Sequence, residues 1–121
     1  MMSPLLLLAA GAGCGVGAVL RFLVGRIDHP QSFPWPTIAV NAAGATLLAW
    51  LTAAATAGGI TEAELVVLGG GLAGGLTTFS SMAVDAVVLF QDGRRRDAAL
   101  YLAATFAVGV CGAWIGWTLG A

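Results

Sequence analysis

The sequence has few charged side chains, and it has no lysine at all. Only 9% of its 121 residues are charged, whereas 59% are hydrophobic. A water-soluble domain of this size needs a polar surface around its core, so the composition argues against one. There is also no footprint for a nucleic acid, because three of the five basic residues, all arginines, fall in one turn. The chain is therefore predicted to lie in a lipid bilayer.

Residue combinations typical of enzymes are missing as well. There is no Ser-His-Asp, Cys-His or metal-ligand arrangement, and the glycine-rich stretch 69–75 lacks the Lys-Ser/Thr ending of a phosphate loop. We therefore predict that the chain is not an enzyme. Cys14 and Cys111 fall within apolar stretches, where we expect buried free thiols and no disulfide or metal pair.

Long apolar stretches are what the sequence does contain. Four of them reach about 20 residues, the length of a helix that crosses a hydrocarbon layer about 30 Å thick. We expect an all-α membrane protein with a single four-helix transmembrane domain over residues 1–121. Its predicted spans are about 4–27, 36–56, 62–90 and 97–119.

Local signals place the ends of these spans. Ser3 followed by Pro4 is typical of a helix start, and Asp28-His29-Pro30 is expected to end the first span. Thr61 with Glu64 three residues later predicts a capping box at the start of the third. Pro36 suits the first turn of the second helix.

The arginines predict the orientation of the chain. Arg26 and Arg94–Arg96 lie in the loops after the first and third spans, while the termini and the other loop contain no basic residue. Basic loops stay in the cytoplasm. We expect a multi-pass protein of the cell inner (plasma) membrane with its arginine-rich loops inside and both termini outside.

Glycines crowd the middle of the third span, at positions 69, 70, 71, 74 and 75. Each costs about 1 kcal/mol in a helix interior. Small residues at this spacing also permit close helix packing, which is the alternative reading. The hydroxyl series Thr77, Thr78, Ser80 and Ser81 follows at once and favours a broken helix whose freed carbonyls and amides could bind ions. The third helix is predicted to be broken at its middle.

Other polar residues within the spans are candidates for function, because lipid penalises them unless they are paired or face water. Arg21 could reach the cytoplasmic surface or stand at a vestibule, and Asn41 could serve an interhelical hydrogen bond or a pore. Asp85 is expected to pair with an arginine or a hydroxyl group rather than to relay protons.

The stretch from Gly74 to Ser81, GGLTTFSS, resembles the signature GGxTTFSTF of the Fluc/CrcB fluoride channels. Residues 17–22 are similar to the glycine-to-arginine pattern of that family's first helix, and residues 33–41 to its second-helix entry. The resemblance extends over essentially the whole chain.

The resemblance implies an antiparallel, dual-topology-type dimer that exports fluoride from the cytoplasm. It further implies a structural Na⁺ at the dimer interface, bound by the main-chain carbonyls of Gly74 and Thr77. The residues implied for the fluoride pathway are Asn41, Phe79, Ser80, Ser81 and Met82, with Arg21 from the first helix and Tyr101 and Thr105 from the fourth. Amide and hydroxyl groups can donate hydrogen bonds to fluoride, and a phenylalanine ring offers its electropositive edge.

Met82 departs from the family pattern, which has phenylalanine there. A thioether lacks an electropositive ring edge, so a dimer of this chain alone lacks that contact in both pathways. The one-sided arginines also conflict with insertion in two orientations. We therefore expect a heterodimer with a homologous subunit of opposite charge bias, with a homodimer as the alternative.

Two other functions fit the sequence less well. A small multidrug-type antiporter needs a membrane-embedded carboxylate in its first helix, yet no acidic residue precedes Asp28. A non-conducting structural subunit would account for the glycines and Met82, but not for Asn41 or the hydroxyl series.

Overall fold

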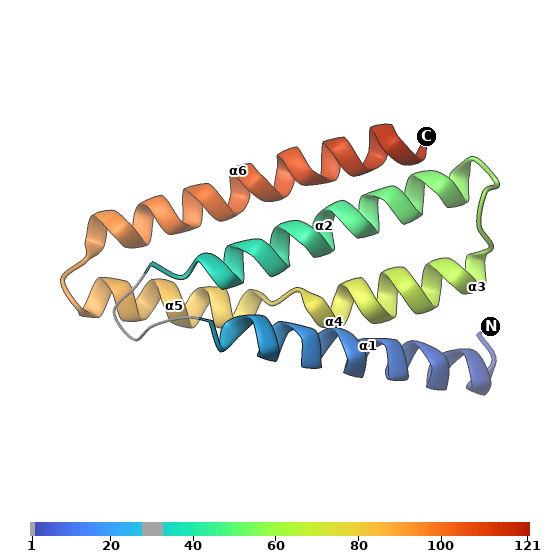
Figure 1. The fold of residues 1–121 in the computed structure, drawn as a ribbon, viewed down its shortest axis with the longest axis horizontal. Helices are drawn as coiled ribbons and strands as arrows, with labels where there is room; N and C mark the ends of the chain where they lie inside the picture. The colour runs from blue at the N-terminus through green and yellow to red at the C-terminus, as the bar shows by residue number, and fades with distance from the viewer. Residues whose placement is uncertain (1, 28–32) are drawn as a thin grey trace.

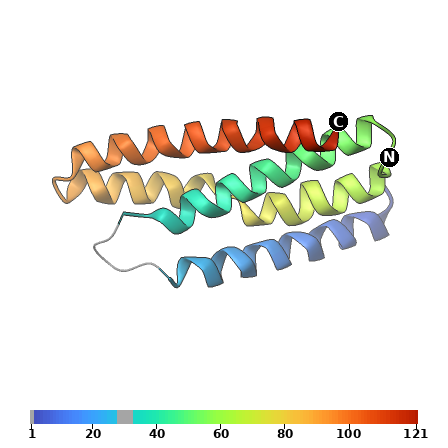
Figure 2. The ribbon, with the colours of Figure 1, turned by 45° about the horizontal axis from the view of Figure 1, so that its top comes forward.

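The computed structural model describes residues 2–27 and 33–121, and every regular element within them is helical. Four segments are long and apolar enough to cross a membrane: Pro4–Gly25, Trp35–Thr56, Glu62–Gln91 and Arg95–Gly120. They run side by side along the long axis of the molecule (Figures 1 and 2). The prediction of an all-α, multi-pass membrane protein with four spans is confirmed.

The first, second and fourth segments are the α-helices α1 (Pro4–Gly25), α2 (Trp35–Thr56) and α6 (Arg95–Gly120). The third segment is composite. It consists of a short turn α3 (Glu62–Glu64), a π-helical stretch η1 (Leu65–Ala73), a second short turn α4 (Gly74–Leu76) and the helix α5 (Phe79–Gln91). Both termini lie at the same end of the bundle as the α2–α3 turn, and the α5–α6 turn lies at the opposite end (Figure 1).

Two predicted helix starts are confirmed. The Ser3 hydroxyl accepts a hydrogen bond from the Leu6 amide at 3.2 Å and caps α1. At the third segment, the Glu64 amide donates to the Thr61 hydroxyl at 3.2 Å, and the Thr61 amide donates to the Glu64 carboxylate at 2.7 Å. Asp28, His29 and Pro30, expected to end the first span, lie outside the described residues.

Two helix ends differ from the prediction by two residues, and the others agree to within one. α1 ends at Gly25 and not at residue 27, because residues 26–27 form a turn. α6 begins at Arg95, two residues earlier than predicted. Arg94 caps it with non-helical backbone, and its guanidinium pairs with Asp97 at 2.8 Å across the first turn. Arg95 and Arg96 are therefore helical residues and not part of a loop.

Glycine allows α1 to contact η1 and α4 through the backbone. A Cβ atom on Gly17 would collide with the Leu72 carbonyl, and one on Gly75 would collide with the Cys14 carbonyl. These two segments therefore approach more closely than side chains would permit. The expected burial of the cysteines is wrong, since both Cys14 and Cys111 are exposed on the outer surface of the subunit.

A side-chain core forms nearer the α5–α6 turn. It joins α2, α5 and α6 around the completely buried Tyr101, which packs with Ile38, Ala86, Leu89 and Ala98. Phe33 places its ring edge-on against the Tyr101 ring, with centroids 5.8 Å apart. Met82 and Ala104 pack against the outside of this cluster. This core holds α5 in place beside α6.

Candidate functional site

The chain leaves helical geometry between α4 and α5, as Figure 1 shows. Thr77 (φ −81°, ψ 155°) and Thr78 (φ −151°, ψ 123°) both have extended backbone. The Thr77 amide still donates to the Ala73 carbonyl at 3.2 Å, and its hydroxyl donates to the Gly74 carbonyl at 3.2 Å. Extended residues cannot continue the i to i−4 ladder, so the peptide groups around Thr78 need other partners.

Asn41 supplies those partners from α2. Its Nδ2 donates to the Thr78 carbonyl at 3.0 Å, and its Oδ1 accepts from the Thr78 amide at 2.7 Å. Thr78 is 8% exposed, so water does not readily replace this pairing. One side chain thus satisfies both polar groups of the same peptide residue and fixes the non-helical backbone against α2.

The hydroxyl groups after Thr78 cap the start of α5. The Thr78 Oγ1 accepts from the Ser81 amide at 3.0 Å and lies 3.3 Å from the Ser80 Oγ. Both serines are exposed. Phe79, the residue between the threonines and the serines, is 79% exposed and faces away from the subunit. Ser80, Ser81 and Phe79 are therefore available to a neighbour or to an ion.

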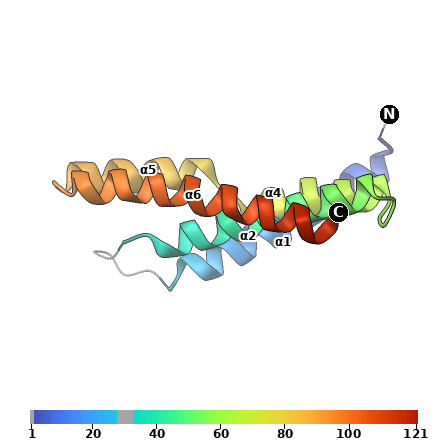
Figure 3. The same ribbon diagram turned by 90° about the horizontal axis from the view of Figure 1, so that it is seen from above.

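A cleft reaches this interruption from the arginine-rich end. Its volume is about 440 Å³. Seen from above, the end of α1 and the helix α5 lie on opposite sides of the bundle there (Figure 3). Residues of α1, α2 and α5 line the cleft: Ala18, Arg21, Phe22, Gly25, Arg26, Pro36, Thr37, Val40, Thr78 and Ser81.

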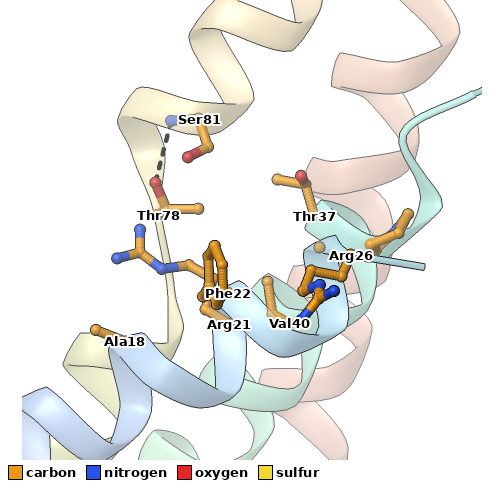
Figure 4. A pocket seen from close by; sticks show the side chains of 10 residues that line it. Ala18, Arg21, Phe22, Arg26, Thr37, Val40, Thr78 and Ser81 are labelled. Atoms are coloured by element: carbon orange, nitrogen blue, oxygen red, sulfur yellow. Dashed lines mark hydrogen bonds between the residues drawn. The ribbon is translucent and has the colours of Figure 1, made fainter. Parts of the chain in front are cut away.

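Two guanidinium groups dominate the electrostatics of the cleft. Arg21 extends from α1 toward Thr78, and Arg26 lies near its mouth (Figure 4). Among the residues that the structure describes, the lining contains no acidic side chain, and its other polar side chains are those of Thr37, Thr78 and Ser81. Two positive charges with hydroxyl donors and no carboxylate favour an anion over a cation.

Asp85 lies beside this cleft on α5 and is held by two hydroxyl groups. Its Oδ2 accepts from the Thr37 Oγ1 at 2.9 Å and from the Tyr101 hydroxyl at 3.1 Å. The expected pairing of Asp85 with hydroxyl groups is confirmed. A smaller hollow of about 240 Å³ is lined by Asp85 with Ser80, Ser81 and Val84. The carboxylate therefore joins three helices next to the serines.

The predicted pathway residues do not all meet in one place. Arg21 and Ser81 line the cleft, and Asn41 holds Thr78 at its inner end. Met82 and Tyr101 instead lie in or against the side-chain core. The Thr105 hydroxyl donates to the Tyr101 carbonyl of its own helix at 2.7 Å.

Thr37, Thr78 and Arg26 all line the cleft, although none of them is among the residues predicted for the fluoride pathway. Thr37 precedes Asn41 by four residues, which places both on one face of α2 and could have indicated it. Arg26 was read only as an orientation signal. Thr78 belonged to the hydroxyl series, but its role depends on the Asn41 pairing, which sequence spacing does not reveal.

The main-chain carbonyl oxygens of Gly74 and Thr77 are ligands of the kind that a small hard cation prefers. Gly74 is exposed at the surface of the subunit, and its carbonyl accepts a hydrogen bond from the Thr77 hydroxyl. Within residues 2–27 and 33–121, no cluster of histidine, cysteine or acidic side chains could hold a metal ion. A cation here would depend on main-chain oxygens, which suit hard ions.

Comparisons with known proteins extend over nearly the whole chain. The family described as CrcB-like protein, Camphor Resistance (CrcB), matches residues 8–117. The chain is 39% identical to fluoride-specific ion channel FluC 2 of Rhodococcus jostii and 42% identical to FluC 1 of Symbiobacterium thermophilum, over 98% of each protein in both cases. It is 40% identical to FluC of Novosphingobium aromaticivorans over 86% of both chains. The chain therefore belongs to the Fluc/CrcB family.

Proposed function

We propose that this chain is one subunit of a fluoride-selective channel that exports fluoride from the cytoplasm. The observation that carries the proposal is the cleft in which Arg21 and Arg26 precede Thr78 and Ser81, at an interruption held open by Asn41. The relatives named fluoride-specific ion channels support the same function. The arginines would gather the anion, and the hydroxyl groups would replace part of its water shell.

The pathway is proposed to continue along the residues inferred from the family pattern. Phe79 and the two serines are exposed at the interruption, where ring edge and hydroxyls could contact a partly dehydrated ion. Asn41 would form the wall by holding Thr78 in place. Tyr101, Thr105 and Met82 would lie deeper, on the side of the core. No step in this pathway makes or breaks a covalent bond.

We further propose that the interruption at Thr77 and Thr78 is a break of the third transmembrane helix at membrane depth. In an antiparallel dimer, the Gly74 and Thr77 carbonyls of both subunits would hold a structural Na⁺ at the interface. The exposure of Gly74 supports this placement. Such a cation adds positive charge near the pathway of an anion.

The charge distribution supports a fixed orientation. Arg26 and Arg94–Arg96 flank one end of the bundle, whereas Glu62 and Glu64 lie at the other (Figure 1). We propose that the arginine end faces the cytoplasm of the inner membrane and that both termini face outward. A second subunit of opposite orientation and charge bias would then complete an antiparallel heterodimer.

Fluoride flux from liposomes tests the channel. The purified chain, alone and with a complementary homologous subunit, is reconstituted with trapped fluoride or chloride, and release is followed with ion-selective electrodes. With the complementary subunit present we expect fluoride release with little chloride release, and from the chain alone we expect little release of either ion. Arg21→Gln should slow fluoride release about tenfold, because a lost charge contact of over 1 kcal/mol has that effect. Thr52→Val, whose hydroxyl bonds only to its own helix, should leave the rate unchanged.

Two outcomes bear on different parts of the proposal. Fluoride release no faster than from protein-free liposomes, with and without the complementary subunit, would refute the channel. Robust fluoride-selective release from the chain purified alone would instead overturn the heterodimer and leave the channel standing.

A further inference from the structure

The arginine run at the start of α6 forms a basic patch at the edge of the membrane-spanning region. Glu62–Gln91 and Arg95–Gly120 are the third and fourth spans, so the residues between and just after them lie at the depth of lipid headgroups. The patch is defined by Arg95, Arg96 and Phe90. It lies outside the cleft described above, whose lining contains none of these residues.

The three arginines of the run have different partners. The Arg94 Nε pairs with the Asp97 carboxylate at 2.8 Å, so that charge is balanced within the chain. Arg95 and Arg96 are exposed, and in the described part of the chain neither forms an ion pair, with Asp92 or with any other carboxylate. Two positive charges therefore remain uncompensated in the first turn of α6, where the helix dipole adds further positive potential.

Phe90 positions the guanidinium group of Arg95. The Arg95 guanidinium lies over the Phe90 ring, 4.8 Å from its centroid. Arginine over an aromatic face is held by cation–π attraction and keeps its N–H groups free for an anion. Phe90 is 53% exposed, so its apolar ring forms part of the surface beside the two guanidinium groups.

An apolar strip continues from Phe90 into the bilayer. Val87 lies one turn earlier on α5 and is also 53% exposed. A free inorganic anion would use only the guanidinium groups of this arrangement. A molecule with a phosphate group above and a hydrocarbon chain below would contact both parts.

We propose that Arg95, Arg96 and Phe90 form a binding site for the headgroup of an anionic phospholipid. The lipid phosphate would accept hydrogen bonds from the two guanidinium groups, and an acyl chain would lie along Phe90 and Val87. Arginine recognises phosphate through paired N–H donors, which makes the contact more directional than a general attraction to the surface. The proposal concerns lipid and does not depend on fluoride conduction.

Native mass spectrometry of the purified chain tests the site. The protein is released from detergent in the presence of dioleoyl phosphatidylglycerol or dioleoyl phosphatidylcholine, and retained lipid is counted for each. Two arginines at a membrane surface should give about a thirtyfold preference for the anionic lipid. Arg95→Gln/Arg96→Gln should abolish most of the preference, whereas Arg95→Lys/Arg96→Lys, which keeps the charge, should retain part of it.

Controls separate this site from other sources of attraction. Arg26→Gln removes one positive charge at the same end of the bundle but outside the patch, and it should lower the preference much less than Arg95→Gln or Arg96→Gln does. Inorganic phosphate at millimolar concentration should not displace the bound lipid. Circular dichroism verifies the helix content of each variant, and if the double glutamine variant does not fold, each single one should lower the preference about fivefold.

Equal retention of the two lipids would overturn the proposal, as would an unchanged preference in the glutamine variants. An equal loss in Arg26→Gln would show a general charge effect and overturn the specific site. Displacement by inorganic phosphate would show an anion site without a lipid and would also contradict it.

Discussion

Replacing Asn41 by leucine removes the side chain that holds the interrupted backbone. Leucine has nearly the same shape but no polar atoms, so the Thr78 amide and carbonyl both lose their partner. A buried group left without a hydrogen bond costs about 1–3 kcal/mol. A hydrogen bond between membrane helices usually contributes less to stability than this, about 0.6–1.7 kcal/mol. For two groups we expect Asn41→Leu to lower the free energy of unfolding by about 1–3 kcal/mol.

The measurement is an SDS titration in mixed micelles, followed by tryptophan fluorescence at one fixed protein concentration, because association of subunits makes stability depend on concentration. Thr52→Val is the matched control. Its hydroxyl donates to the Leu48 carbonyl within α2 at 2.7 Å, and that carbonyl keeps its place in the helix when the hydroxyl is removed. We expect a change below about 0.5 kcal/mol for the control.

A loss in Asn41→Leu no greater than in Thr52→Val would refute the reasoning. It would mean that the Thr78 peptide groups find other partners, such as water in the cleft, at no cost. The proposed rigid wall of the pathway would then have to be abandoned.

Three further predictions concern other elements. Met82→Phe should raise fluoride release about fivefold from liposomes that hold the chain together with its complementary subunit, because an aromatic edge contact amounts to about 1 kcal/mol; an unchanged rate would contradict this. Gly75→Ala should sharply reduce the yield of monodisperse protein in size-exclusion chromatography, because its Cβ would collide with a carbonyl of α1, whereas Gly70→Ala has open space and should not; equal yields would disprove the backbone contact. Tyr101→Phe should lower stability by about 1 kcal/mol in the SDS titration, because it removes a hydrogen bond to Asp85; no change would mean that this bond contributes nothing.

The sequence predicted the parts of the fold that depend on local signals. Four apolar stretches, the Ser3 cap and the Thr61–Glu64 capping box all follow from composition and short spacing, and all are present. The start of α6 at Arg95 was missed, because an arginine run suggests a loop, while the Arg94–Asp97 ion pair bridges the first helical turn. The π-helical geometry of η1 has no comparable sequence signal.

Several residues of the candidate site could be predicted from the sequence, but their contacts could not. Asn41, Arg21 and Ser81 were singled out because lipid penalises polar groups, and that reasoning needs no coordinates. Asn41 and Thr78 are 37 residues apart in the sequence, and their pairing depends on how α2 lies against the third segment. Met82 was placed in the pathway, yet its contact with the core around Tyr101 depends on the rotation of α5 about its axis.

The contact of α1 with η1 and α4 has a consequence for how this protein can change over time. Gly17 and Gly75 each face the main chain of the opposing segment, so the side chain of any other amino acid would collide with it. Substitutions at these two positions should therefore not be tolerated during evolution. Around Ile38 and Leu89 the neighbours are side chains, and exchanges that conserve volume cost less than about 1.5 kcal/mol. Random mutagenesis should therefore return many functional replacements in the α2–α5–α6 core and almost none along the seam between the first and third spans.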